Sequence, residues 1–355
     1  MFTTTKRRAG AIGMAAAAAL ALAACASSTT DEAGSSTSAE PAATEETSAA
    51  FPVTLDTAMG EVTVESEPQR VVTLGSHEHE YLYALGVAPV AVPESWQGYE
   101  LGTAPWADAD RIAAGAEPET FTPGDTYDAE LIASFEPDLI VATYPSHTMT
   151  QEEFDLLSGI APVVTRPGTG ADGVETVEWG VSLADELTLL AAATGTSDKA
   201  EEIIADVDAQ FAAAREAHPE WEGLTSQVGF FWEGNAGVYA STDVRNQFLA
   251  QLGFDVTAVP GSETFLSISA EQLDMLGDLD TLVWQVASNP DARTSLESLP
   301  LFGTLNTTAT GGNVWLTESE LEGAFFANSP SSIPVALEGM VPLLEGAVDG
   351  GSAAE

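Results

Sequence analysis

Three histidines are the first candidates for chemistry, because imidazole ligates transition metals and transfers protons near neutral pH. His77, His79 and His147 each lie near the end of an expected strand. His79 follows His77 by two residues at the start of an expected helix, so both side chains cannot face one crevice. The usual chelating clusters of zinc or manganese sites are missing. We therefore expect polar or solvent-exposed histidines, with direct metal ligation as the alternative.

Signatures of enzymes are also absent. The sequence contains no G-x-S-x-G elbow, no P-loop and no HExxH zinc motif. Gly168, Gly170 and Gly173 have the spacing of a dinucleotide fingerprint, but such a site needs them at the first βα turn. We interpret them as a loop before a helix. Clustered carboxylates are too common in this chain to indicate catalysis, so an exported α/β hydrolase is the least favoured class.

The charge of the chain excludes another class of function. The 355 residues include 10 basic and 55 acidic ones, which gives a formal net charge of −45. A chain this acidic cannot neutralise phosphates, so nucleic-acid binding is excluded. We interpret the acidity as a heavily solvated surface, and attraction of cationic ligands is the alternative. With 45% hydrophobic residues the chain is long enough for two modest cores.

The N-terminal residues have the pattern of a targeting segment. Lys6-Arg7-Arg8 is a positive region, Ala11 to Ala21 is a short apolar run, and Leu22-Ala23-Ala24 precedes Cys25, the only cysteine in the chain. This resembles the lipobox of bacterial lipoproteins. The resemblance implies that residues 1–24 are a signal peptide and that Cys25 carries a diacylglycerol on the outer face of a plasma membrane. An ordinary secretory signal or a transmembrane anchor is the alternative.

Residues 25–52 are expected to form a disordered, lipid-anchored tether, because they are rich in Ser, Thr, Ala and Glu and offer almost nothing to bury. Cleavage before Cys25 would remove three basic residues and no acidic ones, leaving a net charge of −48. A lone cysteine excludes a disulfide framework and a thiolate metal site. No later apolar segment is long enough to cross a bilayer.

An internal repeat predicts two similar lobes. Leu82 to Val92 aligns without a gap on Leu249 to Val259, and in both segments a helix ends at Leu-Gly before a strand. Alternating strands and helices indicate parallel sheets with helices on both faces. One predicted helix covers Val174 to Thr194, with apolar residues on one face, and a second covers Ser197 to Ala217.

The repeat has a second element, the segment Ala129 to Thr143. It matches Ala270 to Gln285 when one residue is inserted before Leu279. In this alignment Glu130 corresponds to Glu271, and Asp138 corresponds to Asp280. The two matches occur in the same order, which makes a chance resemblance less plausible than a duplicated α/β design.

The chain resembles the periplasmic-binding-protein family of the iron-siderophore and cobalamin type, the substrate-binding lipoproteins of ABC importers. The resemblance covers about residues 70 to 344 in family order. It is carried by RVVTLGSHEHEYLYALGVAPVAV, YDAELIASFEPDLIVAT, KAEEIIADVDAQFAAAREAHPEW, VRNQFLAQLGF, SAEQLDMLGDLDTLVW, LFGTLNTTATGGNVW and SPSSIPVALEGMVPLL.

The resemblance implies an α/β fold of two Rossmann-like lobes with central sheets, joined by a single long helix and holding a ligand in the cleft between them. We place the N-terminal lobe at 53–173, the interlobe helix at 174–195 and the C-terminal lobe at 196–348. The implied partners are a small iron chelate and an ABC permease with its ATPase, and the implied state is a monomer. Glu130 and Glu271 occupy the positions of the family's permease-docking glutamates, one on each lobe.

The resemblance also points to residues for the cleft. Arg245 lies in the segment that matches an arginine-containing turn of the family, and its guanidinium suits the metal-bound oxygens of a ligand because it donates several hydrogen bonds and stays charged. A surface or interlobe salt bridge is the alternative for it, and Arg293 is a weaker second candidate. Further candidate contacts at strand ends are His77, Trp96, Tyr144, Trp232, Gln285 and Phe326.

The ligand itself is expected to be a ferric siderophore. With so few cationic residues, a strongly anionic ferric tris-catecholate would be poorly compensated, so a neutral or cationic ferric hydroxamate is favoured. Haem, cobalamin or a bare metal ion bound by the same fold are the alternatives. Apart from lipid on Cys25 we expect no cofactor.

Overall fold

The computed structural model describes residues 51–350, apart from residues 96, 146, 178, 257 and 259–263. The signal peptide expected at 1–24, the lipidation site Cys25 and the candidate Trp96 therefore lie outside the described residues. The same holds for the tether expected at 25–52, except for its last two residues. Phe51 packs against the buried core, so ordered structure begins before position 53 because this ring has apolar partners.

The N-terminal lobe is built on a sheet of five parallel strands in the order β5-β4-β3-β6-β7. Strands such as Leu139–Ala142 are fully buried apolar runs, as expected where both faces of a parallel sheet are covered. An antiparallel hairpin of β1 and β2 precedes this sheet. The strands are β1 (Val53–Thr57), β2 (Gly60–Val64), β3 (Val71–Thr73), β4 (Ala91–Pro93), β5 (Glu119–Phe121), β6 (Leu139–Ala142) and β7 (Val163–Thr165).

The C-terminal lobe has a mixed sheet in the order β11-β9-β8-β12-β13, with β10 also paired to β8. Strands β8, β10, β12 and β13 are parallel, whereas β9 and β11 run antiparallel at one edge. The two-lobed α/β class predicted from the sequence is thus confirmed. The strands are β8 (Thr225–Trp232), β9 (Asn235–Tyr239), β10 (Asp255–Val256), β11 (Phe265–Ile268), β12 (Thr281–Gln285) and β13 (Asn313–Leu316).

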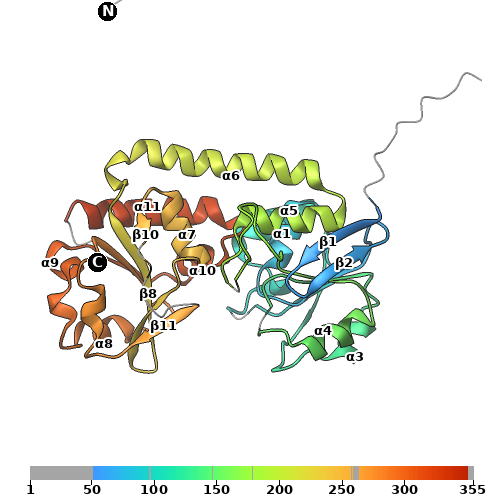
Figure 1. Ribbon diagram of the computed structural model, residues 1–355, viewed down its shortest axis with the longest axis horizontal. Helices are drawn as coiled ribbons and strands as arrows, with labels where there is room; N and C mark the ends of the chain where they lie inside the picture. Colours follow the sequence, from blue (N-terminus) through green and yellow to red (C-terminus); the bar gives the residue numbers. More distant parts are fainter. Residues whose placement is uncertain are drawn as a thin grey trace, which may run out of the picture. The chain divides into compact units, whose positions relative to one another are not determined.

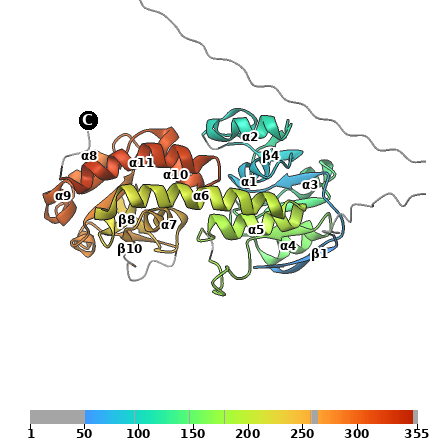
Figure 2. The ribbon, with the colours of Figure 1, turned by 90° about the horizontal axis from the view of Figure 1, so that it is seen from above.

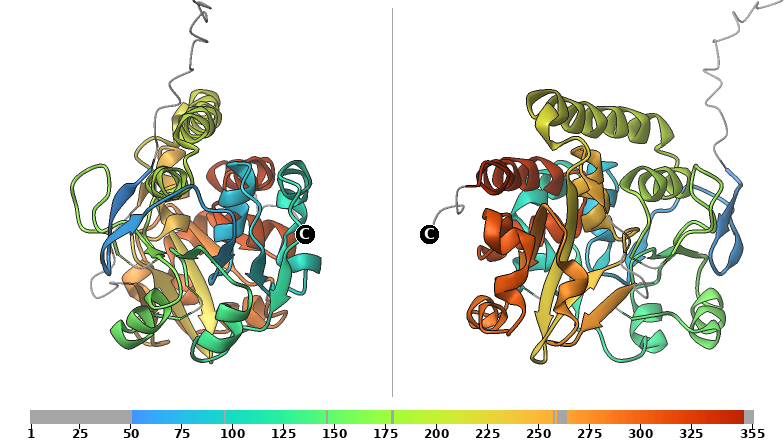
Figure 3. Two further views of the ribbon diagram at one scale, coloured as in Figure 1. Left: turned by 90° about the vertical axis from the view of Figure 1, so that its right-hand side faces the viewer. Right: turned by 60° about the vertical axis from the view of Figure 1, so that its left-hand side comes forward.

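Helices cover both faces of each sheet (Figure 1, Figure 3). In the N-terminal lobe α3 and α4 bury Ile132 and Leu157 on one face, while α1 and α5 pack on the other. In the C-terminal lobe α8 buries Leu296 on one face, and α7 and α11 pack on the other. The helices are α1 (Glu78–Ala84), α2 (Asp108–Ala113), α3 (Ala129–Ser134), α4 (Gln151–Ser158), α5 (Leu183–Thr194), α6 (Ser197–Ala217), α7 (Val244–Gln251), α8 (Ala292–Glu297), α9 (Asn306–Thr310), α10 (Ser319–Ala327) and α11 (Ser332–Val348), with short 3-10 turns η1 (Glu100–Gly102), η2 (Pro105–Ala107), η3 (Pro219–Trp221), η4 (Leu273–Leu276) and η5 (Phe302–Thr304).

The repeat read from the sequence recurs in the backbone. Asp138 accepts the backbone N–H groups of Gln69 and Arg70 just before β3, and Asp280 accepts the backbone N–H and the hydroxyl of Thr225 at the start of β8. In each lobe this aspartate joins the first strand of the sheet to its neighbour. The Leu-Gly helix ends also match, because Gly86 and Gly253 both have the positive φ of a helix C-cap.

The helix that joins the lobes is not the one placed at 174–195. Helix α5 begins only at Leu183, where the Ser182 side chain accepts the N–H of Asp185. The preceding segment is not helical, and Trp179 in it has a φ of 67°, which a right-handed helix cannot contain. Val177 and Val181 have the spacing of a helix although they lie in a non-helical segment. The helix predicted from the sequence was therefore too long at its start. The long helix is α6, which runs along both lobes (Figure 1, Figure 2).

The two lobes share one hydrophobic core. A single cluster of buried side chains contains Leu139 and Leu190 from the N-terminal lobe and Val228 and Met340 from the C-terminal lobe. Helix α6 contacts α5, α7 and α11. Large rotation of one lobe against the other would shear this close-packed interior, so we expect only small lobe movements.

Hydrogen bonds also cross the lobe junction. The Glu80 carboxylate of α1 accepts from the Ser329 hydroxyl at 2.5 Å and from the Trp106 indole N–H at 2.8 Å. The Tyr81 hydroxyl donates to the Asn328 carbonyl at 2.9 Å. Ser329 and Asn328 lie between α10 and α11, so α1 is joined to the C-terminal lobe by polar contacts as well as by packing.

Ionisable groups with displaced pKa values gather at this junction. Burial raises the pKa of Glu78 to about 8 and that of Glu80 to about 7. Burial also raises the pKa of Glu186 to about 7. In the opposite direction, burial lowers the pKa of His77 to about 3 and that of His79 to about 4. All five groups are therefore held preferentially in their neutral forms.

We expect the free energy of unfolding to fall as the pH rises from about 6.5 to about 8. A carboxyl group with a raised pKa keeps its proton in the folded state, so its stabilising contribution is lost as the pH rises through the folded value. The two histidines act in the opposite direction, but only below their unfolded pKa near 6.5. Each proton released on unfolding contributes up to about 1.4 kcal/mol per pH unit. Urea unfolding across this range at constant ionic strength measures the slope.

A matched pair of variants assigns this slope to the junction. Glu80→Gln keeps an oxygen that accepts from Ser329 and Trp106 but cannot titrate, so the slope should become shallower by about one proton. Glu338→Gln removes a carboxylate from an exposed position on α11 and should leave the slope unchanged. An unaltered slope in Glu80→Gln would contradict the assignment.

Candidate functional site

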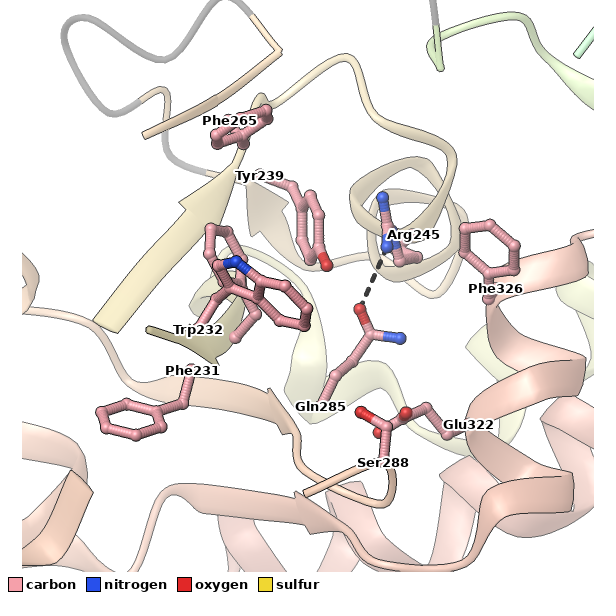
Figure 4. Close-up of a pocket in the computed structure, with 10 residues that line it drawn as sticks. Phe231, Trp232, Tyr239, Arg245, Phe265, Gln285, Ser288, Glu322 and Phe326 are labelled. Carbon is pink, nitrogen blue, oxygen red and sulfur yellow. Dashed lines mark hydrogen bonds between the residues drawn. The ribbon is translucent and has the colours of Figure 1, made fainter. Parts of the chain in front are cut away.

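An aromatic pocket of about 350 Å³ opens at the edge of the C-terminal sheet (Figure 4). It lies at the carboxyl ends of β8 and β12, where parallel α/β sheets leave a crevice. Helix α7 closes one side and α10 another. Its volume and apolar walls suit a small-molecule site. The lining residues are Phe230, Phe231, Trp232, Tyr239, Arg245, Phe265, Gln285, Ser288, Glu322 and Phe326.

Arg245 is the buried cation of this pocket. It stands in the first turn of α7, whose N-cap Asp243 accepts the backbone N–H of Arg245. The Asp243 carboxylate also accepts two hydrogen bonds from the guanidinium, from Nε and Nη2, each at 2.7 Å. Burial alone would lower the pKa of Arg245, but the Asp243 carboxylate raises it above its ordinary value. Arg245 is therefore permanently charged, and its charge is compensated inside the protein.

Three further contacts hold the guanidinium flat at the pocket wall. Its central carbon lies 3.4 Å from the ring centroid of Tyr239 and 5.2 Å from that of Phe326. Nη1 donates to the Gln285 side-chain oxygen of β12 at 3.1 Å. Three of the five N–H groups are thereby used, and the remaining ones can donate to oxygens of a ligand.

Glu322 of α10 places a carboxylate in the same pocket. Its Oε2 accepts the backbone N–H of Ala287 at 2.9 Å, just after β12 ends. The residue is 7% exposed, and burial raises the pKa of its carboxyl group above the ordinary value. Sequence reasoning missed Glu322 because nothing distinguishes it from the many other helical glutamates of the chain. Tyr239 and Phe265 were also missed, because β9 and β11 were not predicted.

The N-terminal lobe contributes a cluster of rings behind Phe326. His77 lies 4.2 Å from Tyr144 and 5.8 Å from Phe326 between ring centroids, and Tyr144 packs edge-on against Trp179 at 4.5 Å. His77 and Tyr144 are both buried. They therefore support the pocket wall through Phe326 rather than line the aromatic pocket.

The three histidines do not converge. His79 Nε2 lies 3.1 Å from the Gly102 carbonyl oxygen, and His147 Nε2 lies 3.0 Å from Glu153 Oε1. The His147 ring also stacks on Tyr127. Among the described residues, no group of three His, Cys, Asp or Glu side chains could hold a metal ion. The expectation of exposed histidines is wrong for His77 and His79, which are buried because aromatic neighbours pack on them.

Of the other candidate residues, two line the aromatic pocket and Arg293 lies elsewhere. Trp232 and Gln285 line it, and Trp232 is 70% exposed at its mouth. Arg293 lines a different pocket, where it pairs with Glu297 and lies over the Trp315 ring. Its place on α8, on the face of the sheet opposite to α7, keeps it from joining Arg245.

The two glutamates paired by the repeat are both exposed. Glu130 lies in the first turn of α3, whose N-cap Asp128 accepts the N–H of Glu130. Glu271 precedes the short 3-10 turn η4 instead of opening an α-helix. The local structures differ, and the glutamates precede Asp138 and Asp280 by eight and nine residues, respectively.

The glycine loop at 166–173 has no features of a dinucleotide site. It does not open a helix, since α5 begins only at Leu183. The N–H of Ala171 donates to the Asp185 carboxylate at 2.8 Å, so a carboxylate stands where a phosphate would be needed. Separately, the described part of the chain contains no helix that combines the length and apolar character needed to cross a membrane.

Comparisons with known proteins identify the family and the fold of this chain. A sequence model of the family described as "Periplasmic binding protein" matches residues 71–317. The probable siderophore-binding lipoprotein YfiY of Bacillus subtilis is 29% identical over 225 residues, and the match spans 61% of this chain and 61% of that relative. The curated relative is thus matched over less than two thirds of its length.

Solved structures share the fold. A periplasmic solute binding protein of Mycobacterium smegmatis is 31% identical, with a TM-score of 0.70 over 83% of this chain and 98% of that chain. PiaA of Streptococcus pneumoniae in complex with ferrichrome is 24% identical, with a TM-score of 0.72 over 84% of this chain and 99% of that chain. The second likeness concerns the fold alone.

Proposed function

This chain belongs to the periplasmic binding protein family, and on that premise we propose that it captures a ferric siderophore and delivers it to the permease of an ABC importer. The observation that carries the proposal is the aromatic pocket with the buried guanidinium of Arg245 at its wall. A siderophore wraps iron in a largely apolar shell with a few oxygens at its surface. Aromatic walls can bury such a shell, and the remaining N–H groups of Arg245 can meet the oxygens.

One relative supports this class of ligand, because the Bacillus subtilis protein is named a probable siderophore-binding lipoprotein. Proteins of this kind bind their substrate without converting it, so we infer stoichiometric saturation rather than turnover. The residues that we assign to the ligand are Arg245, Gln285 and Trp232, with His77 and Tyr144 acting as support.

Charge favours a hydroxamate over a catecholate. The positive charge of Arg245 is already paired with Asp243, and Glu322 adds a carboxylate to the pocket wall. A ferric tris-catecholate carries three negative charges in a site with no uncompensated cation among the described lining residues. Burying such charges without partners is costly. A neutral or cationic ferric hydroxamate avoids that cost.

We also propose that the protein is located at the plasma membrane. The lipobox-like segment before Cys25 supports a lipid anchor on the outer face of the plasma membrane, with residues after it serving as a tether. Glu130 and Glu271, exposed on separate lobes, are the proposed contacts to the two permease subunits. Hydrolysis of ATP by the cytoplasmic subunits would then drive release of the ligand.

The first test is a fluorescence titration of the chain from Ala26 onward. We expect saturable quenching of tryptophan emission by ferrioxamine or ferrichrome at sub-micromolar concentration, because Trp232 stands at the mouth of the pocket. Ferric catecholate, ferric citrate, haem, cobalamin and zinc serve as competing probes. Trp232→Phe keeps an aromatic wall and should remove much of the quenching while calorimetry still records binding.

Each outcome of the titration bears on the proposal. Binding of haem, cobalamin or zinc alone would leave the fold class intact and refute the siderophore assignment. Tight binding of the catecholate would refute the charge argument. If none of the probes bound, the transport role would be rejected.

A further inference from the structure

A second cavity adjoins the aromatic pocket. It measures about 290 Å³ and is lined by Gln97, Tyr99, Ser288, Ser319 and Glu322. Ser288 and Glu322 line both cavities, so the two spaces adjoin at these two residues. Gln97 and Tyr99 belong to the N-terminal lobe, whereas the other three residues belong to the C-terminal lobe. A ligand in the aromatic pocket could therefore extend an arm past Glu322 and between the lobes.

The second cavity differs from the first in chemistry. Its described lining contains a carboxylate, two hydroxyl-bearing serines, an amide and a phenol ring, and no basic side chain. Gln97 Nε2 donates to the Ser319 carbonyl at 3.1 Å, which fixes this amide across the lobe junction. Acceptor oxygens beside an aromatic ring suit an ammonium group, which needs acceptors and is attracted to π faces.

Charge strengthens the contrast between the two cavities. Arg245 is compensated by Asp243 in a bidentate pair. Glu322 forms no salt bridge among the described residues: its carboxylate accepts from backbone N–H groups after β12, and the Arg245 charge attracts it without direct pairing. Glu320 of the same helix adds a negative charge near Tyr99. The meeting point of the two cavities is therefore net anionic.

We propose that this second cavity is a subsite for a positively charged arm of the iron chelate, with Glu322 as the residue that selects for the charge. The proposal rests on the siderophore-binding function proposed above and narrows it to chelates that carry a pendant ammonium. The iron and its oxygen shell occupy the aromatic pocket against Arg245, and the arm reaches Glu322 and Tyr99. Lysine-like or cadaverine-like amines on hydroxamate chelators have the required chemistry.

A structural role for Glu322 is compatible with the assignment and must be separated from it. The carboxylate fixes the turn after β12 by accepting from Ala287 at 2.9 Å. Glu322→Gln keeps an oxygen acceptor for that N–H and removes only the charge. Glu338→Gln, at an exposed position of α11 outside the lining of both cavities, removes the same formal charge elsewhere.

The test compares two probes that differ only at the arm. Ferrioxamine B carries a terminal ammonium, and its N-acetylated form has the same iron-binding shell without the charge. We expect the wild-type protein to bind ferrioxamine B about tenfold or more tightly, the size of one hydrogen bond to a charged group. Glu322→Gln should bring the ratio of the two dissociation constants close to one by weakening binding of ferrioxamine B. Glu338→Gln should keep the wild-type ratio.

The outcomes separate this inference from the function on which it rests. Equal affinity of the wild-type protein for both probes would overturn the subsite while leaving siderophore binding in place. A wild-type ratio in Glu322→Gln, or a lost ratio in Glu338→Gln, would also overturn it, because the selection would then come from shape or from the overall negative charge. Failure of the wild-type protein to bind either probe would overturn this inference, and the separate titration with ferrichrome would then decide whether the hydroxamate function stands.

Discussion

Replacing Arg245 with methionine is expected to weaken binding of a ferric siderophore by about 10- to 150-fold, the range for a lost hydrogen bond to a charged group. Arg245 is the one cation that lines the described part of the aromatic pocket. Its position is fixed by Asp243, Tyr239 and Gln285. Because these contacts orient the side chain before a ligand arrives, its remaining donors lose little freedom on binding. Calorimetric titration with ferrichrome measures the loss.

The same replacement should destabilise the protein, and a second variant separates the two effects. Methionine at 245 leaves the Asp243 carboxylate buried without its partner, which lowers the free energy of unfolding by about 3–5 kcal/mol. In the double variant Asp243→Asn/Arg245→Met the charge is gone, and asparagine still accepts at the N-cap of α7. We expect urea unfolding to show recovered stability and calorimetry to show binding still lost. Recovered binding in the double variant would contradict a ligand role for Arg245.

Reversing the charges of Glu130 and Glu271 to arginine is expected to abolish uptake without changing ligand affinity. Both side chains are exposed, and neither lines the aromatic pocket. If they dock on arginines of the permease, the double variant places like charges opposite each other, which costs several kcal/mol at an interface. Uptake of radioactive iron by cells that carry the variant as their sole copy should fall at least about tenfold.

A control with the same change in charge excludes a nonspecific effect. Glu201 and Glu216 are exposed on α6, and Glu201→Arg/Glu216→Arg alters the net charge of the chain by the same amount. This control should transport iron at the wild-type rate. Weakened ligand binding in the Glu130 and Glu271 variant, or an equal transport defect in the α6 control, would count against docking by these two residues.

Much of the local structure could be predicted from the sequence. Ser197–Ala217 is a helix with the predicted bounds, and the helix ends at Leu85-Gly86 and Leu252-Gly253 lie where the repeat predicted them. These segments have apolar runs or helical periods with clear ends. The helix expected from Val174 fails because the turn at Trp179 interrupts a period that happens to continue beyond it. Apolar residues at helical spacing indicate that one side of a segment is buried. A non-helical segment that packs on a core can have the same spacing.

The candidate site could be predicted only where the family resemblance or a strand end marked a residue, as for Arg245, Trp232 and Gln285. Arg245 and its partner Asp243 are two residues apart, and both stand at the start of one helix. Tyr239 and Glu322 reach the same pocket from the antiparallel strand β9 and from α10, about 80 residues further along. No short-range pattern marks either of them, so the aromatic wall was underestimated and the acidic group was missed.

The sequence by itself determined the two-lobed α/β class, the repeat centred on Asp138 and Asp280, the negative charge and the lipobox-like segment at Cys25. Those features depend on composition, spacing and turn chemistry, which act over a few residues. The tertiary structure decided that α6 connects the lobes, that Arg293 stands apart from Arg245, and that Glu322 lies between two cavities. These three features depend on how segments that are distant in the chain pack together. That packing is decided by which apolar surfaces bury each other away from water, and local sequence patterns do not specify it.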